Sequence, residues 1–315
     1  MKCHLGVCLA FALVSTAVPA GDRACPSTGV QLQVLGSGGV ELSPERAGSS
    51  YLIWVNGRAR LLVDIGHGAA RRLAQSGADI GAVEALLLTH THADHTADLA
   101  TLVQAAVLAQ RNRALPIYGP TGNRFAPSAV TFVRALFDNT RGAWRHLGDV
   151  LSPMTRDGFK LEPHDVRERS RTLAARREAP AAPIEIEFDG LNAAAVPVVH
   201  GVYPALAWRV RVADKTIVFT GDMNGEGDGF ARLARGADIL VASHAIAEGT
   251  GKVERFLHMP PSVIGQLAAR AGARQLVLAH RGAATLGREA ETTGHIRQHY
   301  AGALGFADDL ACYTP

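Results

Sequence analysis

The sequence has little charge of either sign and few aromatic residues. Charged residues make up only 19% of the 315 residues and the formal net charge is +3, so bulk charge does not indicate a dedicated nucleic-acid binder. The hydrophobic content of 47% excludes a wholly disordered chain. A chain of this length can bury a large core as one or two domains without relying on disulfides.

Long hydrophobic runs are confined to the N-terminus. A single Lys at position 2 precedes an apolar run from Leu5 to Val18, and small residues follow up to Ala20. This pattern predicts a secretory signal peptide over residues 1–20, because a retained membrane anchor needs about 20 apolar residues. We therefore expect a periplasmic or secreted protein with no stable membrane insertion.

Cysteine is also scarce. Cys3 and Cys8 lie in the predicted leader, which leaves Cys25 and Cys312 near the two ends of the mature chain. In an oxidising compartment these two could form a disulfide that ties the termini together, or both could stay free thiols. The sequence leaves both alternatives open, because it gives no distance between them.

Hydrophobic periodicity predicts two similar halves, each with antiparallel hairpins followed by strands that alternate with helices. Strands are expected at 30–35, 50–55, 59–64, 84–89, 115–118, 184–188, 192–199, 205–212, 215–220, 238–242 and 275–279, and helices at 96–110, 128–138, 228–235, 260–271 and 287–301. The charged, Pro/Ala-rich stretch 156–183 is expected to be an insertion, either solvated or forming an anion-attracting lip. Two such halves predict an α+β fold with four layers, αββα.

Residues 89–95 (THTHADH) concentrate three imidazoles and a carboxylate between a strand and a helix. In an extended stretch His90 and His92 point to one side and can bind one metal ion. The turn into the helix redirects Asp94 and His95 towards a second ion. Imidazole and carboxylate ligands suit Zn²⁺, and Mn²⁺ or Fe²⁺ can use the same ligands.

With this motif the chain resembles the metallo-β-lactamase superfamily over about residues 30–285. Four further positions match the family pattern in order: Asp64, His200, Asp222 and His280. The resemblance implies the four-layer αββα metallo-β-lactamase sandwich and a hydrolase domain over residues 21–315.

The resemblance also implies a ligand set for two metal ions, most simply two Zn²⁺. The ligands would be His90, His92 and His200 for the first ion, Asp94, His95 and His280 for the second, and Asp222 between both. Two close metals lower the pKa of a shared water and yield a bridging hydroxide as nucleophile. Asp94 could also orient that nucleophile, and Asp64 would hold the His loop from outside the ligand set.

An Asp at position 222 argues against the β-lactam-cleaving branches of the family. The opening residues 34–39 and the stretch 258–261 are most similar to the ribonuclease Z and arylsulfatase branch. By that resemblance His258 would donate a proton to the leaving group. His244 and His67 each follow a strand and are either substrate-side residues or structural ones.

The spacing of two ligands bears on the substrate. Transfer-RNA-processing members carry an RNA-gripping arm between the third His and the bridging Asp, but only 22 positions separate His200 from Asp222. We expect no transfer RNA partner and predict a small-molecule ester, either a phosphodiester or a sulfate ester. A lactonase or carboxylic or thioester hydrolase, and a non-catalytic metal-binding scaffold, are the alternatives. A homodimer also stays open.

Overall fold

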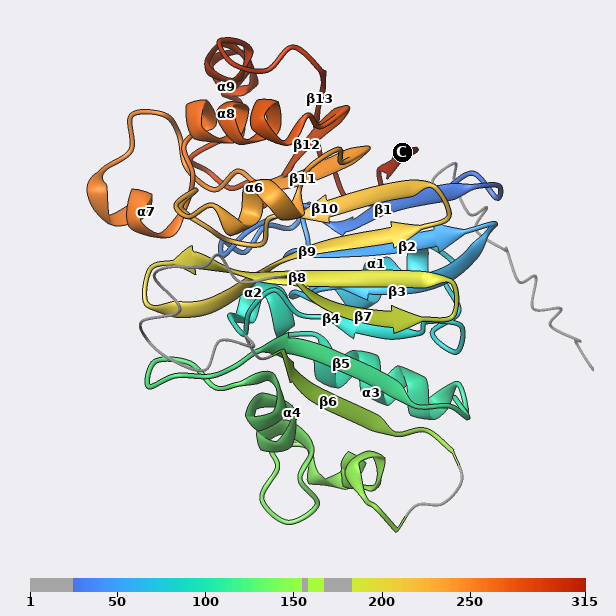
Figure 1. The fold of residues 1–315 in the computed structure, drawn as a ribbon. Coiled ribbons are helices and arrows are strands. Elements are labelled where there is room, and N and C mark those ends of the chain that lie inside the picture. The colour runs from blue at the N-terminus through green and yellow to red at the C-terminus, as the bar shows by residue number, and fades with distance from the viewer. Residues whose placement is uncertain (1–24, 155–157, 167–182) are drawn as a thin grey trace, which may run out of the picture.

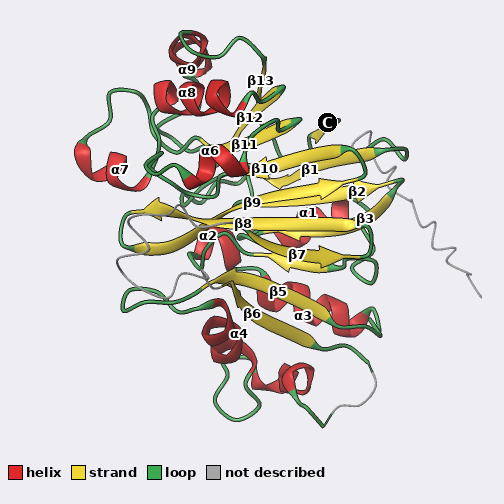
Figure 2. Cartoon of the chain, viewed as in Figure 1, coloured by secondary structure: helices red, strands yellow, loops and turns green. Residues whose placement is uncertain are grey.

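The structure, a computed structural model, describes residues 25–154, 158–166 and 183–315. Two mixed sheets of seven strands face each other, and helices cover the outer face of each (Figures 1 and 2). The predicted αββα layering is therefore confirmed. The predicted leader, 1–20, lies outside the described residues, and within them no helix has the length and apolar character needed to cross a membrane.

The first sheet has the strand order β14-β1-β2-β3-β4-β5-β6. Its strands are β1 (Val30–Gly36), β2 (Ser50–Val55), β3 (Arg58–Val63), β4 (Ala85–Leu87), β5 (Leu115–Pro120), β6 (Leu161–Val166) and β14 (Cys312–Tyr313). The strands β14, β1, β2 and β3 pair antiparallel, whereas β3, β4, β5 and β6 run parallel. The accompanying helices are α1 (Ala69–Gln75), α2 (Ala93–Thr96), α3 (Leu99–Leu108), α4 (Ala129–Phe137) and a 3-10 helix (Arg145–Leu151).

The second sheet has the order β13-β12-β11-β10-β9-β8-β7 and the same change of direction. Its strands are β7 (Ile184–Phe188), β8 (Leu191–His200), β9 (Tyr203–Val212), β10 (Lys215–Phe219), β11 (Ile239–Ser243), β12 (Gln275–Ala279) and β13 (Ala303–Phe306). The strands β7, β8, β9 and β10 pair antiparallel, whereas β10, β11, β12 and β13 run parallel. The helices of this half are α6 (Gly229–Leu233), α7 (Lys252–Leu257), α8 (Pro261–Ala271) and α9 (Glu289–Arg297).

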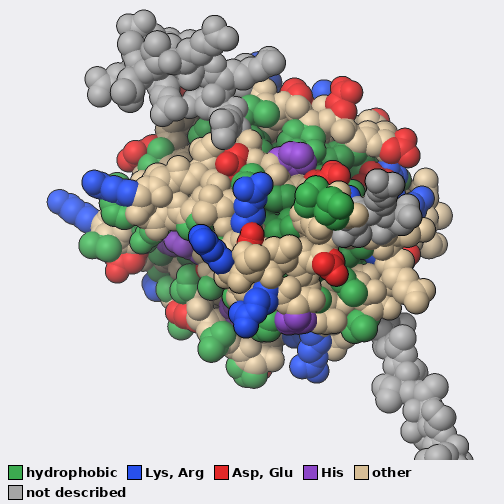
Figure 3. All heavy atoms as spheres, turned by 90° about the horizontal axis from the view of Figure 1, so that it is seen from below, with side chains coloured by type: hydrophobic (Ala, Val, Ile, Leu, Met, Phe, Trp, Pro, Cys, Tyr) green, Lys and Arg blue, Asp and Glu red, His purple; other side chains and the backbone are tan. Residues whose placement is uncertain are grey.

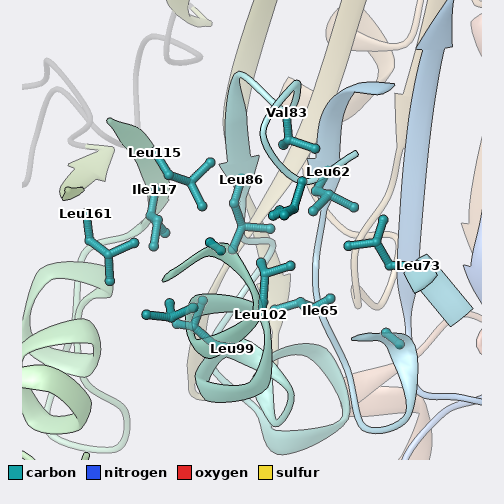
Figure 4. Close-up of a cluster of buried hydrophobic side chains, with 14 of the residues drawn as sticks. Leu62, Ile65, Leu73, Val83, Leu86, Leu99, Leu102, Leu115, Ile117 and Leu161 are labelled. Atoms are coloured by element: carbon teal, nitrogen blue, oxygen red, sulfur yellow. The ribbon is translucent and has the colours of Figure 1, made fainter. Parts of the chain in front are cut away.

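Apolar strands supply three buried layers. In β3, Leu62 faces the helices of the first sheet while Leu61 and Val63 face the second sheet, as the two-residue repeat of a strand requires. Figure 4 shows the helix-side layer, in which Leu62 and Leu86 of the strands lie close to Leu102 of α3. Because both faces of these strands are covered, their sequences are continuous apolar runs rather than alternating ones.

The strand β6 differs from the prediction, because it lies inside the stretch expected to be an insertion. Leu161 and Val166 are buried, and the strand pairs with β5 along its whole length. Pro163 is tolerated there because β6 is the edge strand of its sheet. Of the rest of the predicted insertion, residues 156–157 and 167–182 lie outside the described residues.

A disulfide joins Cys25 to Cys312, with the two Cα atoms 5.6 Å apart. Cys312 belongs to β14, which pairs antiparallel with β1 through Gln33. The bond therefore fastens the C-terminal strand and the start of the described chain to the same edge of the first sheet. Of the two alternatives left open by the sequence, the structure has the paired cysteines.

Replacing both Cys25 and Cys312 by Ser should lower the free energy of unfolding by about 2 to 4 kcal/mol, because the disulfide closes a loop of 287 residues and restricts the unfolded chain. Denaturant unfolding of the protein, with and without a reductant, measures this difference. The reductant should destabilise the unmodified protein and leave the double variant unchanged. Equal stability of both proteins under oxidising conditions would contradict the prediction.

Candidate metal centre

The predicted ligands meet at the edge where the strands β3, β4, β8, β10 and β12 reach their carboxyl ends. Each of these strands either ends in a polar residue of the predicted set, as β8 does in His200, or is followed by one within a few residues. Because the carboxyl ends of parallel strands lie at one edge of a sheet, residues far apart in sequence converge there. The two sheets face each other, so their edges form one cluster.

The His loop, residues 89–95, takes the predicted path between β4 and the helices. His92 is extended and forms the N-terminal cap of α2, so Asp94 and His95 lie within the first turn. The second sheet fixes this loop from the opposite side. The Leu206 amide donates to the Thr89 carbonyl oxygen over 2.8 Å, and the Trp208 indole donates to that of Leu88 over 3.0 Å.

One group of candidate ligands consists of His90, His92 and His200, whose donor atoms lie within 4.8 Å of one another. His200 Nε2 lies 3.4 Å from His92 Nδ1. The other nitrogen of His200, Nδ1, donates to the carbonyl oxygen of Leu257 over 2.9 Å. This hydrogen bond leaves Nε2 of His200 facing the cluster, as in many metal-binding histidines.

A second group consists of Asp94, His95, Asp222 and His280, again within 4.8 Å of one another. His280 Nε2 lies 3.0 Å from Asp94 Oδ2 and 3.3 Å from Asp222 Oδ2. His95 Nε2 lies 3.5 Å and 3.6 Å from the same two oxygens. All four side chains are buried.

The carboxylate of Asp222 lies between the two groups. Its Oδ2 is 3.9 Å from Nε2 of His90 and of His200, and it also faces the second group. Its Oδ1 accepts a hydrogen bond from the hydroxyl of Ser243 over 2.9 Å. Ser243 was not predicted, although its position as a polar residue at the carboxyl end of the apolar strand β11 is the kind of signal that identified the other residues.

Asp64 lies next to the His loop, outside the two groups of candidate ligands. Its carboxylate accepts hydrogen bonds of 2.7 Å from the amide and from the hydroxyl of Thr89. His95 Nδ1 donates to the same carboxylate over 2.8 Å, which points His95 Nε2 into the cluster. Asp64 and His280 both have left-handed backbones, with φ of 57° and 58°, a strain of about 1 to 3 kcal/mol each that functional sites often retain.

The close packing of acids and imidazoles shifts their pKa values strongly. Burial opposes a charge on His95, but the carboxylates of Asp222, Asp64 and Asp94 outweigh it and raise the pKa of His95 well above its usual value. For His280, burial is likewise outweighed, mainly by Asp222, and the pKa rises to about 9. Burial would raise the pKa of Asp94, but His95 and His280 lower it to about 2. The site therefore favours ionised carboxylates beside positive charge.

The donor set fits a divalent cation. Nε2 of His90 and Nε2 of His95 are buried and, among the described residues, have no hydrogen-bond partner. Both nitrogens point to the region where the carboxylate oxygens of Asp94 and Asp222 also lie. Buried polar atoms are rarely left unpaired, and a divalent metal, typically Zn²⁺, accepts this mixture of imidazole and carboxylate ligands.

His258 borders the cluster. Its Nδ1 lies 3.9 Å from Asp222 Oδ2, and its ring centroid is 5.3 Å from that of His200. The side chain is half-buried between the two ligand groups and the short helix α7. Burial is the main cause that lowers the pKa of His258 to about 4.

The structure does not bring His244 or His67 into this cluster. His244 is fully buried under α9, where its Nε2 lies 3.2 Å from the hydroxyl of Thr292. Burial, together with Arg281, lowers its pKa to about 4. His67 lies against Gly48, whose amide donates to the His67 carbonyl oxygen over 2.8 Å.

The fold and the His/Asp cluster together define a hydrolase of the metallo-β-lactamase fold. The family model of the metallo-beta-lactamase superfamily matches residues 43–264, and the chain belongs to this superfamily. The resemblance drawn from the sequence is thereby confirmed.

Proteins named ribonuclease Z are similar in sequence to this chain. The chain is 28% identical over 295 residues to a ribonuclease Z of Mycolicibacterium paratuberculosis, covering 89% of this chain and 96% of the relative. It is 31% identical over 197 residues to a ribonuclease Z of Mycobacterium sp. strain KMS, covering 61% of each.

Solved structures share the fold. The metallo-beta-lactamase fold protein YhfI from Bacillus subtilis superposes with a TM-score of 0.68 at 20% identity, covering 90% of this chain and 98% of the other. The short form of human tRNase Z gives a TM-score of 0.66 at 21% identity, with the same coverage.

Replacing Asp64 by Asn should weaken binding of Zn²⁺ about 10- to 100-fold, because His95 would lose the carboxylate that orients its ring. Competition of the metal-free protein with a chromogenic chelator measures this affinity. The matched control is Asp214→Asn, in an exposed turn between β9 and β10, which should bind Zn²⁺ like the unmodified protein. Unchanged affinity in folded Asp64→Asn would show that this carboxylate does not support the site.

Proposed function

We propose that this protein is an exported, dinuclear metal-dependent hydrolase of small phosphodiesters or sulfate esters. The observation that carries the proposal is the position of Asp222. One of its oxygens faces both ligand groups, and Ser243 holds the other. A single buried carboxylate between two clusters of imidazoles is the arrangement expected of a ligand shared by two cations.

The ligands would be His90, His92 and His200 for one cation, Asp94, His95 and His280 for the other, and Asp222 for both. When bound, two divalent cations supply a nucleophile at neutral pH by lowering the pKa of coordinated water, and they stabilise negative charge in the transition state.

The chain's own acidic and basic groups would complete the chemistry. Asp94 Oδ2 lies 3.0 Å from His280 Nε2. The Asp94 carboxylate can orient the attacking water as well as bind a cation. His258, beside Asp222, is the residue we propose to protonate the leaving oxygen. An anionic ester next to His258 would raise the low pKa that burial imposes on it, and so favour the protonated imidazole.

The substrate class is inferred from the relatives and from one hairpin. The relatives are named ribonuclease Z, which supports cleavage of a phosphodiester bond. Between His200 and Asp222 the chain forms only the hairpin of β9 and β10, so the position of an RNA-gripping arm is taken by two sheet strands. This supports a small ester in place of transfer RNA.

One face of the described residues carries side chains of both charges. In the view from below, several Lys and Arg side chains of the described residues lie near the middle of the face, interspersed with acidic, hydrophobic and uncharged ones (Figure 3). Nucleic-acid-binding faces usually carry a continuous basic stripe.

For export, the support is the leader-like pattern of residues 1–20 together with the disulfide, which forms and persists in oxidising compartments.

The mature, Zn²⁺-loaded protein should hydrolyse bis(p-nitrophenyl) phosphate or p-nitrophenyl sulfate, and a chelator should remove this activity reversibly. Replacing His92 by Ala should lower kcat about 100-fold or more, because the first ligand group loses a donor. The matched control is His146→Ala, an exposed imidazole of the 3-10 helix, which should leave kcat unchanged.

Three results would count against this assignment. Hydrolysis that persists in the demetallated protein would remove the metals from the mechanism. Inactivity on both esters, with turnover of a lactone or thioester, would assign the protein to the alternative substrate class. If the protein binds Zn²⁺ in full but hydrolyses neither the two esters nor a lactone or thioester, a metal-binding scaffold would be favoured.

A further inference from the structure

The short helix α7 leaves its apolar side chains exposed. None of its six residues is buried, and Val253 and Phe256 keep 75% and 51% of their surface accessible. These two residues are three positions apart, so they lie on one face of the helix. An apolar helix face normally packs against a core, and exposed apolar side chains next to a candidate active site are available to contact a ligand.

This helix is attached directly to the candidate metal centre. The Gly201 amide donates to the carbonyl oxygen of Phe256 over 3.1 Å, and His200 Nδ1 donates to that of Leu257. Gly201 has a left-handed backbone, and a Cβ on it would lie 3.0 Å from the Phe256 ring and 2.6 Å from Leu257. The glycine therefore lets the aromatic ring approach the turn that follows a candidate ligand.

A second loop brings more apolar surface to the same turn. Val202, 41% exposed, accepts a hydrogen bond at its carbonyl oxygen from the amide group of Asn123 over 2.8 Å. Phe125, 49% exposed, follows in that loop, and its amide donates to Asn123 Oδ1 over 2.8 Å. The guanidinium carbon of Arg124 lies 4.6 Å from the centroid of the Phe125 ring.

We propose that the substrate ester carries a hydrophobic alkyl or aryl group, which binds to an apolar rim formed by Phe125, Val202, Val253 and Phe256. The proposal rests on the proposed hydrolysis of an anionic ester at the metal centre. The rim meets the centre at the turn after His200, so an ester held by the metals can place its organic group on these side chains. Arg124 adds a positive charge beside the rim, which suits a substrate with one negative charge.

The chemistry of the rim separates this substrate from a nucleotide. Specific recognition of a nucleotide combines stacking of the base on an aromatic ring with side chains that hydrogen-bond to the base edge and the ribose. The four side chains of the rim are hydrocarbon only, and they gain free energy by removing apolar surface from water. The cation of Arg255, in α7 itself, is paired with Glu248 and the Thr250 carbonyl oxygen of its own loop.

The test compares two ligands that differ only in their organic group. Phenylphosphonate and methylphosphonate present the same anion to the metals, and calorimetry on the Zn²⁺-loaded protein measures both affinities without requiring turnover. The phenyl compound should bind about 10- to 50-fold more tightly, from the additional apolar area it buries. Thymidine 5′-monophosphate serves as the nucleotide probe.

Replacing Phe256 by Ala should reduce the ratio of the two affinities at least about fivefold, and Val202→Ala should reduce it less. The matched control is Leu108→Ala, which removes an exposed apolar side chain at the end of α3 and should leave the ratio unchanged. Thermal unfolding checks that all three variants are folded.

Equal affinities for the two phosphonates, or a preference that Phe256→Ala does not change, would overturn the proposal. Tighter binding of thymidine 5′-monophosphate, with the same dependence on Phe256, would replace the hydrophobic substrate by a nucleotide and would also overturn it. A phenyl preference in a protein that hydrolyses no ester would support the rim while refuting the proposed hydrolysis, so the two failures are distinguishable.

Discussion

The structure of the centre depends on one buried carboxylate, that of Asp222, surrounded by imidazoles. Removing a carboxylate from water is costly, and here the cost is offset by facing imidazoles and by the Ser243 hydroxyl. The buried carboxylate of Asp64 is stabilised in the same way, by hydrogen bonds from His95 and Thr89. It lies outside the two groups of candidate ligands. The two acids lie on opposite sides of His95, so its ring orientation is determined by the protein before any cation binds.

The fold positions these groups through the direction of its strands. Both sheets change from antiparallel to parallel pairing, and the carboxyl ends of the parallel strands meet at one edge. Residues between Asp64 and His280 thus converge although more than two hundred positions separate them. The cross-sheet hydrogen bonds from Leu206 and Trp208 fix the His loop of one sheet to the other sheet.

The hydrophobic periodicity of the chain and its His/Asp motifs predicted most of this arrangement. The features that they did not predict have physical causes. The long apolar strands and the loop 89–95 were predictable because buried strands and metal ligands restrict residue types. The strand β6 was missed because only its two end residues are buried, and α7 because it buries none. The role of Ser243 rests on a single hydrogen bond to Asp222, and such a bond leaves no pattern along the sequence. The pairing of Cys25 with Cys312 depends on their distance in space, which the sequence does not give.

The bond between Cys25 and Cys312 turns the described chain into a covalent ring. The first sheet is built from residues 30–166 and β14, and the second from residues 184–306. A single cut of the chain between those two blocks would leave both halves joined through sulfur. The halves would also stay in contact through the buried layer between the sheets. A nicked molecule can therefore keep its two ligand groups facing each other.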